Sequence, residues 1–137
     1  ELNTKKDDLL VNALQRTSHV VLQNSVREGF GLTVTEALWK GTPVVGTEVG
    51  GIPLQVIHEK TGALGNNSKE AADWCVKLIK NDKLRIKMGQ EGKEHVRKNF
   101  LITRHLYDYL NVIDEYTSTA ADDIMKAAKY LKRIILR

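Results

Sequence analysis

One stretch decides the fold: Arg27-Glu28-Gly29-Phe30-Gly31-Leu32-Thr33-Val34-Thr35-Glu36-Ala37-Leu38-Trp39-Lys40-Gly41-Thr42-Pro43-Val44-Val45-Gly46. It reads as a glycine loop, a helix that starts near Leu32, a turn at Gly41 and a buried strand opened by Pro43. A loop of small residues that feeds a helix N-terminus presents unpaired N–H groups and the positive end of the helix dipole, which suits a phosphate. Two carboxylates flank this point, Glu28 and Glu36, and carboxylates accept hydrogen bonds from sugar hydroxyls.

Strand and helix patterns alternate on both sides of this stretch. A continuous apolar run at 19–23 predicts a strand that is buried on both faces, as in a parallel sheet. Further short strands are predicted at 44–46 and 61–65, and helices at 4–16, 32–40 and 52–57. This alternation predicts the α/β class. The parallel sheet is expected to be a partial Rossmann-like one, because a complete sheet of this kind usually has about five or six strands.

Several α-helices follow the predicted sheet. Helical spacing indicates segments at 68–79, 82–96 and 102–116, and one more amphipathic helix from Ser118 onward. Ser68 is expected to cap the first of these helices, and Gly89 and Gly92 are expected to weaken the second. The last helix has aspartates at its start and basic residues at its end, which the helix dipole favours.

Composition and charge exclude several classes of protein. The chain has 137 residues, a net charge of +4 and one cysteine, Cys75. The charge is mild for a nucleic-acid binder, and one cysteine forms neither an intrachain disulfide nor a cysteine-built metal site. No apolar run approaches the roughly 18 residues that a bilayer span needs. We therefore expect a cytoplasmic protein without nucleic-acid or membrane partners. The missing initiating methionine and the small sheet indicate a fragment of a longer chain.

Two common phosphate-binding fingerprints fail in the glycine loop. The third glycine of a G-x-G-x-x-G motif would fall on Val34, and no Gly-Lys-Ser/Thr follows as in phosphate-loop NTPases. A second glycine loop, at 47–51, follows the next predicted strand. Because the carboxyl ends of parallel strands share one edge of a sheet, both loops are expected to lie together there. The two glutamates would repel a bare phosphate, so they favour a ligand that joins phosphate to hydroxyl-rich groups.

Several motifs together resemble one enzyme family. In chain order they are Glu28-Gly29-Phe30-Gly31-Leu32, Glu36-Ala37, Gly41-Thr42-Pro43-Val44-Val45 and Gly50-Gly51-Ile52. The chain resembles the carboxyl-terminal donor domain of the retaining glycosyltransferases of family four, which have the GT-B fold. The blocks Gly50-Gly51-Ile52-Pro53-Leu54-Gln55 and Trp39-Lys40-Gly41 are most similar to the trehalose synthase (glycosyltransferring) and trehalose phosphorylase branch. The resemblance implies a donor-binding domain over residues 1–116, with 117–137 as an additional amphipathic helix.

The resemblance also implies a role for each matching residue. Glu28 would be the catalytic carboxylate beside the donor sugar, and Glu36 would accept hydrogen bonds from the ribose of a nucleoside diphosphate. The other donor-binding positions are Gly29, Phe30 and Gly31 for the sugar hydroxyls, Leu32 and Thr33 for the distal phosphate, and Gly50 and Gly51 for the lining of the pocket. The reaction would need no metal or other cofactor. Two cationic residues and the amino-terminal acceptor domain would lie upstream of Glu1, so this piece is expected to be inactive alone.

Three functions stay open at this point. The first is transfer of a glycosyl group from an NDP-glucose type donor to a sugar acceptor in trehalose synthesis. The second is a phosphorylase that releases sugar phosphate and needs no nucleoside. The third is a non-catalytic module that associates with itself through the tail helix. Because part of the sheet is expected to be missing, exposed apolar strand and helix faces are also expected to drive formation of a homodimer or exchange of elements.

Overall fold

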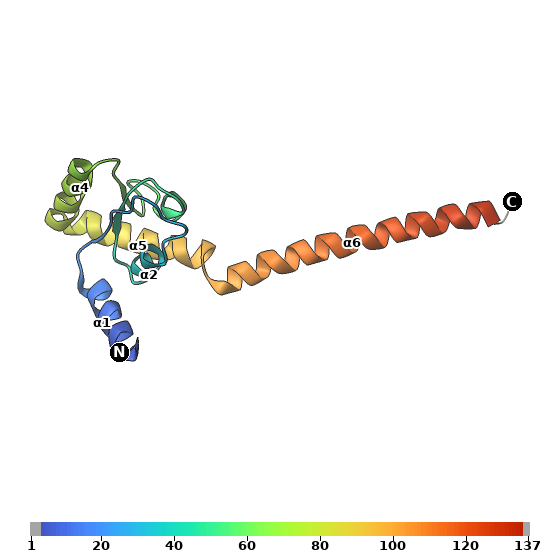
Figure 1. The fold of residues 1–137 in the computed structure, drawn as a ribbon, viewed down its shortest axis with the longest axis horizontal. Helices are drawn as coiled ribbons and strands as arrows, with labels where there is room; N and C mark the ends of the chain where they lie inside the picture. The colour runs from blue at the N-terminus through green and yellow to red at the C-terminus, as the bar shows by residue number, and fades with distance from the viewer. Residues whose placement is uncertain (1–3, 136–137) are drawn as a thin grey trace. The chain divides into compact units, whose positions relative to one another are not determined.

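A computed structural model describes residues 4–135 of the chain (Figure 1). Its elements are α1 (Thr4–Thr17), β1 (Val21–Gln23), α2 (Leu32–Trp39), β2 (Val44–Gly46), α3 (Ile52–Gln55), β3 (Gly62–Leu64), α4 (Ser68–Lys80), α5 (Asp82–Asn99) and α6 (Ile102–Ile135). The chain divides into two compact units, Glu1–Phe100 and Leu101–Arg137. The first unit has the alternating α/β order that the sequence predicts, and the second consists of α6.

The three strands form one parallel sheet in the order β1-β2-β3. The central strand β2 is fully buried, with Val44 and Val45 at 0% exposure. The expectation that the first strand is buried on both faces is wrong. Leu22 of β1 is 54% exposed, so one face of this edge strand is open.

One cluster of buried apolar side chains joins the sheet to α4 and α5. Its buried members are Val45, Ala63, Ala71, Leu78 and Met88. Trp74 and Cys75 of α4 pack against this cluster in half-buried positions. Burial raises the pKa of the Cys75 thiol above its ordinary value. Cys75 is therefore a packing residue of the core.

Helix α4 begins with a cap one residue earlier than predicted. The Asn67 side chain, and not Ser68, accepts a hydrogen bond from the Glu70 N–H at 3.0 Å. The Glu70 carboxylate in turn accepts one from the Asn66 N–H at 2.9 Å. Asn67 has extended backbone angles whereas Ser68 is already helical, so only Asn67 can place its side chain over the first turn.

Two glycines allow α5 to lie directly against α2 and the turn that follows it. A Cβ atom on Gly89 would overlap the carbonyl oxygen of Gly41, and one on Gly92 would lie 2.8 Å from Cδ2 of Leu38. Helix α5 runs without a break through both positions. The low helix propensity of glycine is offset here by the close packing of two helices that its missing side chain permits.

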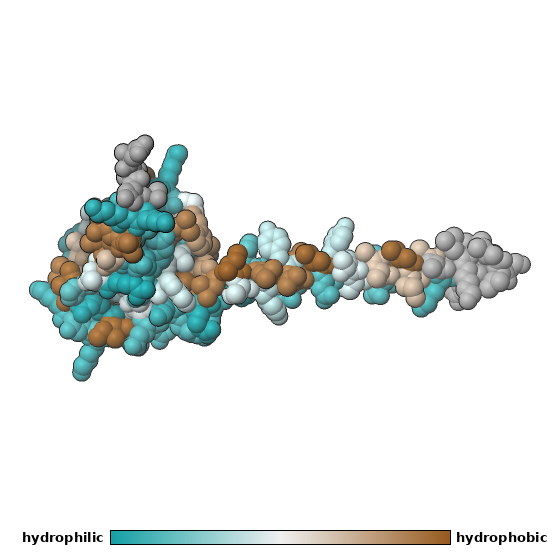
Figure 2. Space-filling model, turned by 90° about the horizontal axis from the view of Figure 1, so that it is seen from below, coloured by the Kyte–Doolittle hydropathy of each residue, from teal (hydrophilic) through white to brown (hydrophobic). Residues whose placement is uncertain are grey.

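The second unit is a single helix and not the two helices that the sequence predicts. Helix α6 runs through 116–118, where Thr117 and Thr119 donate hydroxyl hydrogen bonds to the carbonyls of Ile113 and Glu115 at 2.9 and 2.8 Å. These bonds satisfy the polar side chains inside the helix, so they do not interrupt it. The domain boundary predicted at 116/117 lies within this helix and stays a prediction. Figure 2 shows apolar side chains recurring along the exposed surface of α6.

None of the helices within residues 4–135 combines the length and the apolar character that crossing a bilayer requires.

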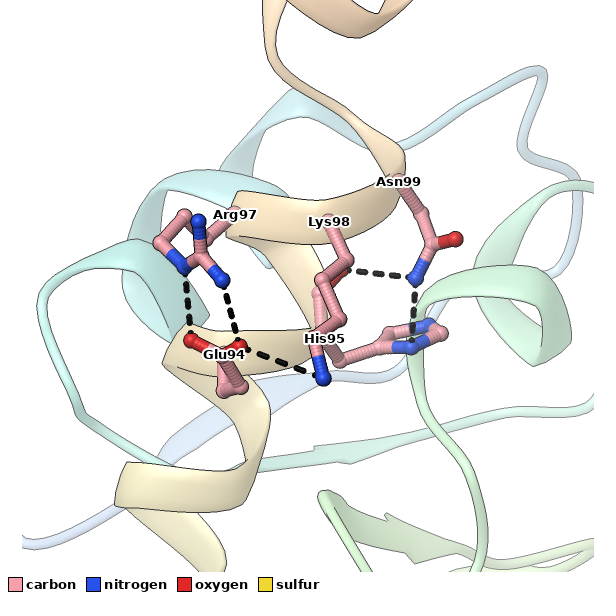
Figure 3. Close-up of polar contacts among 5 residues, drawn as sticks. All are labelled: Glu94, His95, Arg97, Lys98 and Asn99. Carbon is pink, nitrogen blue, oxygen red and sulfur yellow. Dashed lines mark hydrogen bonds and ion pairs between the residues drawn. The ribbon is translucent and has the colours of Figure 1, made fainter.

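A small ion-pair network lies on the last turns of α5 (Figure 3). The Glu94 carboxylate accepts two hydrogen bonds of 2.7 Å from the Arg97 guanidinium and lies 3.2 Å from Nζ of Lys98. These two cations lower the pKa of Glu94 to about 2. On the next face of the same helix, Nε2 of His95 lies 2.9 Å from the carbonyl oxygen of Leu54, which ties α5 to α3.

The packing of α5 on α2 predicts that Gly89→Ala destabilises the first unit despite the better helix propensity of alanine. The new Cβ would force the Gly41 carbonyl and α5 apart, and overpacking of this kind costs about 1–3 kcal/mol. Urea unfolding followed by tryptophan fluorescence measures the loss. Gln90→Ala, at the exposed neighbouring position, is the control and is expected to change stability little. Equal stabilities of the two variants would contradict the close approach.

The ion-pair network predicts a pH dependence. A folded-state pKa of about 2 lies below the ordinary value of 4.5, so Glu94 contributes stability above pH 4.5 and that contribution is lost as the pH falls toward 2. Glu94→Gln is therefore expected to flatten the decline of stability between these pH values. Urea midpoints measured across this range test it. Glu91→Gln on the same helix is the control, and an unchanged slope in the Glu94 variant would contradict the assignment.

Candidate functional site

The two glycine loops meet at the carboxyl edge of the sheet, as the sequence predicts. The first loop follows β1 and the second follows β2. The Gly51 N–H donates a hydrogen bond of 2.8 Å to the Gly29 carbonyl. A Cβ on Gly51 would lie 2.8 Å from the Gly29 oxygen, and one on Gly50, whose φ is +55°, would overlap the Glu28 oxygen. Both glycines are thus needed for the close approach of the loops, whereas their role in lining a pocket stays a prediction.

The first loop ends in an open helix N-terminus. Gly31 occupies the N-cap position of α2 with φ of 88°, and no side chain caps the helix. The Gly31 carbonyl accepts from the N–H of Val34 at 3.0 Å. Among the hydrogen bonds of residues 4–135, none uses the N–H of Leu32 or Thr33, and both residues are exposed. Two N–H groups and the positive end of the helix dipole are therefore open to an anion, as predicted.

Glu28 lies half-buried between β1 and the start of the loop. Its Oε2 accepts hydrogen bonds from Nε2 of Gln23 at 3.3 Å and from Oγ of Ser25 at 3.4 Å. Its Oε1 accepts from the N–H of Gly29 at 3.1 Å. Gln23 and Ser25 hydrogen-bond to each other at 2.8 Å, so both donors are fixed in place. These donors give the Glu28 carboxylate one orientation at the carboxyl end of the strand.

Glu36 belongs to a different network from Glu28. Its Oε2 accepts a hydrogen bond of 3.3 Å from Nε2 of Gln15, a buried residue of α1. The Gln15 Oε1 accepts in turn from Nζ of Lys40. Glu36 itself is exposed, and its Oε1 has no partner among the described residues. The predicted pair of carboxylates thus occupies two separate positions on α2 and the loop before it, with one free oxygen on Glu36 for a ligand.

A buried glutamine, to which the sequence motif assigns no role, connects the parts of the site. Gln55 is 0% exposed. Its Nε2 donates to the carbonyl of Phe30 and lies 3.4 Å from the carbonyl of Gly51, while its Oε1 accepts from Oγ1 of Thr35 at 2.5 Å. One side chain therefore connects both glycine loops to α2. Gln55 is a polar residue in a short apolar helix, where such a residue is unexpected. This feature of the sequence could have indicated its role.

The ring of Phe30 fixes the loop from the other side. It packs against Phe100 at a centroid distance of 5.7 Å, and Phe100 packs against His95 at 5.4 Å. Because His95 also contacts the Leu54 carbonyl, this aromatic row joins the end of α5 to the loop and to α3. Phe30 is still 40% exposed, so part of the ring remains on the surface.

The structure brings most of the predicted site residues close together. In the second loop, Gly50 and Gly51 lie against Glu28, Gly29 and Phe30 of the first loop, which ends at Gly31. Leu32 and Thr33 lie on the adjoining helix turn, and Glu36 lies about one turn further along α2. Within residues 4–135, no three His, Cys, Asp or Glu side chains gather as a group that could hold a metal ion. The absence of a metal from the reaction stays a prediction.

Comparison with known proteins decides the family. The model of the family described as "Glycosyl transferases group 1" matches residues 2–95. The chain belongs to this family. It is 51% identical over 104 residues to a trehalose synthase of Pyrococcus horikoshii, which covers 76% of this chain and 25% of the relative. A trehalose phosphorylase of Pleurotus pulmonarius is 41% identical over 92 residues, covering 65% of this chain and 12% of the relative. The chain thus spans about a quarter of the length of the synthase that it matches.

Solved structures of glycosyltransferases confirm the fold. A sucrose-phosphate synthase from Thermosynechococcus elongatus superimposes with a TM-score of 0.66 at 26% identity, over 74% of this chain and 26% of the other. The carboxyl-terminal domain of a group 1 glycosyl transferase from Francisella tularensis superimposes with a TM-score of 0.61 at 32% identity, over 66% of this chain and 47% of the other. The partial Rossmann-like sheet is therefore part of the carboxyl-terminal domain of a GT-B glycosyltransferase, and the resemblance read from the sequence is confirmed.

The contacts of Gln55 predict that it holds the glycine loop in place. Gln55→Leu keeps the volume but leaves the part-buried Phe30 carbonyl without its donor, which costs about 1 kcal/mol or more. We expect a loss of stability of this size and faster amide hydrogen exchange in residues 29–33. Urea unfolding and hydrogen exchange measure the two effects.

Thr35→Val is the matched control for this clamp. It removes only the hydrogen bond to Oε1 of Gln55 and leaves both donations of Nε2 intact. Its loop exchange is expected to stay close to that of the unchanged chain. If Gln55→Leu exchanges no faster than Thr35→Val in residues 29–33, the donation to Phe30 does not hold the loop.

Proposed function

We propose that this chain is the donor-binding part of a retaining glycosyltransferase that uses an NDP-glucose type donor and transfers the glycosyl group to a sugar in trehalose synthesis. One observation carries the proposal: an oriented carboxylate, Glu28, lies next to a helix N-terminus whose Leu32 and Thr33 N–H groups are open. The anion-binding group and the carboxylate are adjacent along the chain, as the diphosphate and the sugar are in the donor. The identity of about half of the aligned residues with a trehalose synthase supports the choice of pathway.

The open N–H groups of Leu32 and Thr33 would bind the distal phosphate of the donor. Negative charge grows on this phosphate as the glycosidic bond breaks, so fixed N–H dipoles stabilise the transition state more than the ground state. The amides of Gly29, Phe30 and Gly31 would donate to the sugar hydroxyls. They lie in the loop that the Gln55 clamp and the Gly51 N–H hold in one shape, and such a shape is what a preorganised site needs.

Glu28 would act on the sugar and Glu36 on the nucleoside. The anomeric carbon becomes positively charged as the leaving group departs, and a carboxylate held by Gln23 and Ser25 stabilises that charge. The free Oε1 of Glu36 would accept a hydrogen bond from a ribose hydroxyl. The different networks of the two carboxylates fit a ligand long enough to reach both positions.

The remaining parts of the reaction would come from sequence outside this chain. The cationic residues that neutralise the diphosphate and the amino-terminal domain that binds the acceptor belong to the part of the relatives that this chain does not cover. The chain is therefore expected to bind a donor but not to turn it over alone. A reducing cytoplasm is the location that we propose, because the one cysteine is free and packs in the core.

Two other functions have an observation in their favour. A trehalose phosphorylase is among the relatives, and such an enzyme would bind phosphate at the same helix N-terminus without needing Glu36 for a ribose. A non-catalytic module that associates with itself would use the exposed apolar side chains of α6, and its glycine loop would be purely structural.

A titration of the chain with uridine, adenosine and guanosine diphosphates tests the proposed function. We expect saturable binding of at least one of them, detected by calorimetry, and at least about tenfold weaker binding for Glu36→Ala because a hydrogen bond to a charged group contributes about 1.5–3 kcal/mol. Glu115→Ala on α6 is the matched control and is expected to bind normally.

The pattern of ligands separates the three functions. Inorganic phosphate that binds as tightly as any nucleotide, with no effect of Glu36→Ala, would favour the phosphorylase. A folded chain that binds neither phosphate nor a nucleoside diphosphate would contradict the donor site and favour the module.

A further inference from the structure

One buried side chain connects α1 to the carboxylate that is proposed to bind the ribose. Gln15, in the last turn of α1, is only 5% exposed. Its Nε2 donates a hydrogen bond of 3.3 Å to Oε2 of Glu36, and its Oε1 accepts one from Nζ of Lys40. Glu36 lies in α2 and Lys40 is the C-cap of the same helix. A single amide of α1 therefore contacts two charged groups of α2.

The two partners determine which way the Gln15 amide points. An ammonium group can only donate hydrogen bonds, and an ionised carboxylate can only accept them. The amide oxygen must therefore face Lys40, and the amide nitrogen must face Glu36. The backbone of Gln15 is held as well, because the Thr42 hydroxyl donates a hydrogen bond of 2.6 Å to its carbonyl. Gln15 thus presents one donor of fixed direction to Glu36.

The amide also separates two charges that would otherwise pair. Glu36 precedes Lys40 by four positions, and this order of glutamate and lysine is the favourable one for an ion pair on a helix. The ion pairs among the described residues do not include this one. The two groups bond instead to opposite ends of the Gln15 amide. A direct ion pair would occupy Glu36 with an ammonium group, which would compete with a ligand hydroxyl for its oxygens.

We propose that Gln15 is a positioning residue for Glu36 and that it thereby gives the site its preference for ribonucleotide over deoxyribonucleotide donors. This role rests on the proposed function, because it concerns the carboxylate that would bind the ribose. The amide holds Oε2 of Glu36 and keeps Lys40 away, so Oε1 remains an acceptor of fixed direction for a ribose hydroxyl. A nucleotide that lacks this hydroxyl has nothing to donate to Oε1.

The size of the effect follows from when Glu36 becomes ordered. Glu36 is exposed, and an exposed glutamate without a partner occupies several rotamers. Ordering one such side chain at the moment of binding weakens a complex by about two- to tenfold. The hydrogen bond from Gln15 orders Glu36 when the chain folds, so this loss does not fall on the binding step.

Calorimetric titration with matched nucleotides tests the role of Gln15. The probes are uridine, adenosine and guanosine diphosphates, each beside its 2′-deoxy and 3′-deoxy counterparts. Gln15→Met has a similar length but makes neither hydrogen bond, so it frees Glu36 to move and to pair with Lys40. We expect it to bind the ribonucleotide about two- to tenfold more weakly. Binding of the deoxynucleotide that lacks the hydroxyl on Glu36 is expected to stay within about twofold of the unchanged chain.

A second variant tests the same contact without removing the partner of Lys40. Gln15→Glu keeps the shape of the side chain and an acceptor for Lys40, but it replaces the donor that faces Glu36 with a second carboxylate oxygen. We expect the ratio of ribonucleotide to deoxynucleotide affinity to fall at least as far as in Gln15→Met. In a Glu36→Ala background, Gln15→Met is expected to cause no further loss, because the group that it positions is absent.

Thr42→Val is the matched control for the packing of α1. It removes the hydroxyl that holds the Gln15 carbonyl and leaves both contacts of the amide in place. We expect this variant to be less stable but to keep the affinity ratio of the unchanged chain. A tryptophan fluorescence melt checks that every variant is folded at the temperature of the titration, since Trp39 and Trp74 lie in the first unit.

The possible failures are distinguishable. If the chain binds a ribonucleoside diphosphate but Gln15→Met and Gln15→Glu keep its affinity ratio, the proposed function stands and the role of Gln15 is overturned. The same conclusion follows if Thr42→Val lowers the ratio as much as Gln15→Met, because looser packing of α1 would then be the cause. A folded chain that binds no nucleoside diphosphate contradicts the proposed function and the role of Gln15 with it.

Discussion

The structure of the site depends on the close contact between two glycine loops. The hydrogen bond from the Gly51 N–H to the Gly29 carbonyl can form only because neither Gly50 nor Gly51 carries a Cβ atom. The same contact brings the Gln55 side chain under the first loop, where it binds the Phe30 carbonyl. The first loop in turn determines where Glu28 and the start of α2 lie. A change in the second loop would therefore move groups that lie more than twenty positions earlier in the chain.

The sequence correctly predicted the features that depend on the backbone, which are the parallel sheet and the position of the two glycine loops. Short apolar strands that alternate with helices have few solutions other than a parallel sheet, and glycines after consecutive strands must lie at its carboxyl edge. The side-chain contacts were harder to predict. Gln23, Ser25 and Gln55 look like ordinary polar residues in the sequence, and only the fold shows that Gln55 is completely buried and that the other two orient Glu28. The packing role of Gly89 and Gly92 was missed for the same reason, since the atoms that lie against them come from elsewhere in the chain.

The two glutamates illustrate how the surroundings separate residues that sequence spacing groups together. Glu28 and Glu36 are eight positions apart, but the first lies in a loop that β1 and Ser25 hold and the second lies on a helix surface beside α1. Glu28 uses both oxygens for hydrogen bonds to its own loop and strand, so its position is fixed before any ligand binds. Glu36 keeps one free oxygen on an exposed face. A fixed group suits the centre where bonds change, whereas an accessible group suits recognition of the part of a ligand that does not react.

Helix α6 raises a different physical question, namely what stabilises it. In most helices the intrinsic helix propensity and the packing of apolar side chains act together, whereas the apolar side chains of α6 are exposed. Within α6 the hydroxyl groups of Thr117 and Thr119 are satisfied by backbone carbonyls, so nothing in the local sequence ends the helix. Local consistency alone does not explain why its apolar residues stay on one face for more than seven turns. A helix with such a face normally owes its stability to a partner that packs against it. The stability of α6 therefore depends on contacts that its local sequence alone does not supply.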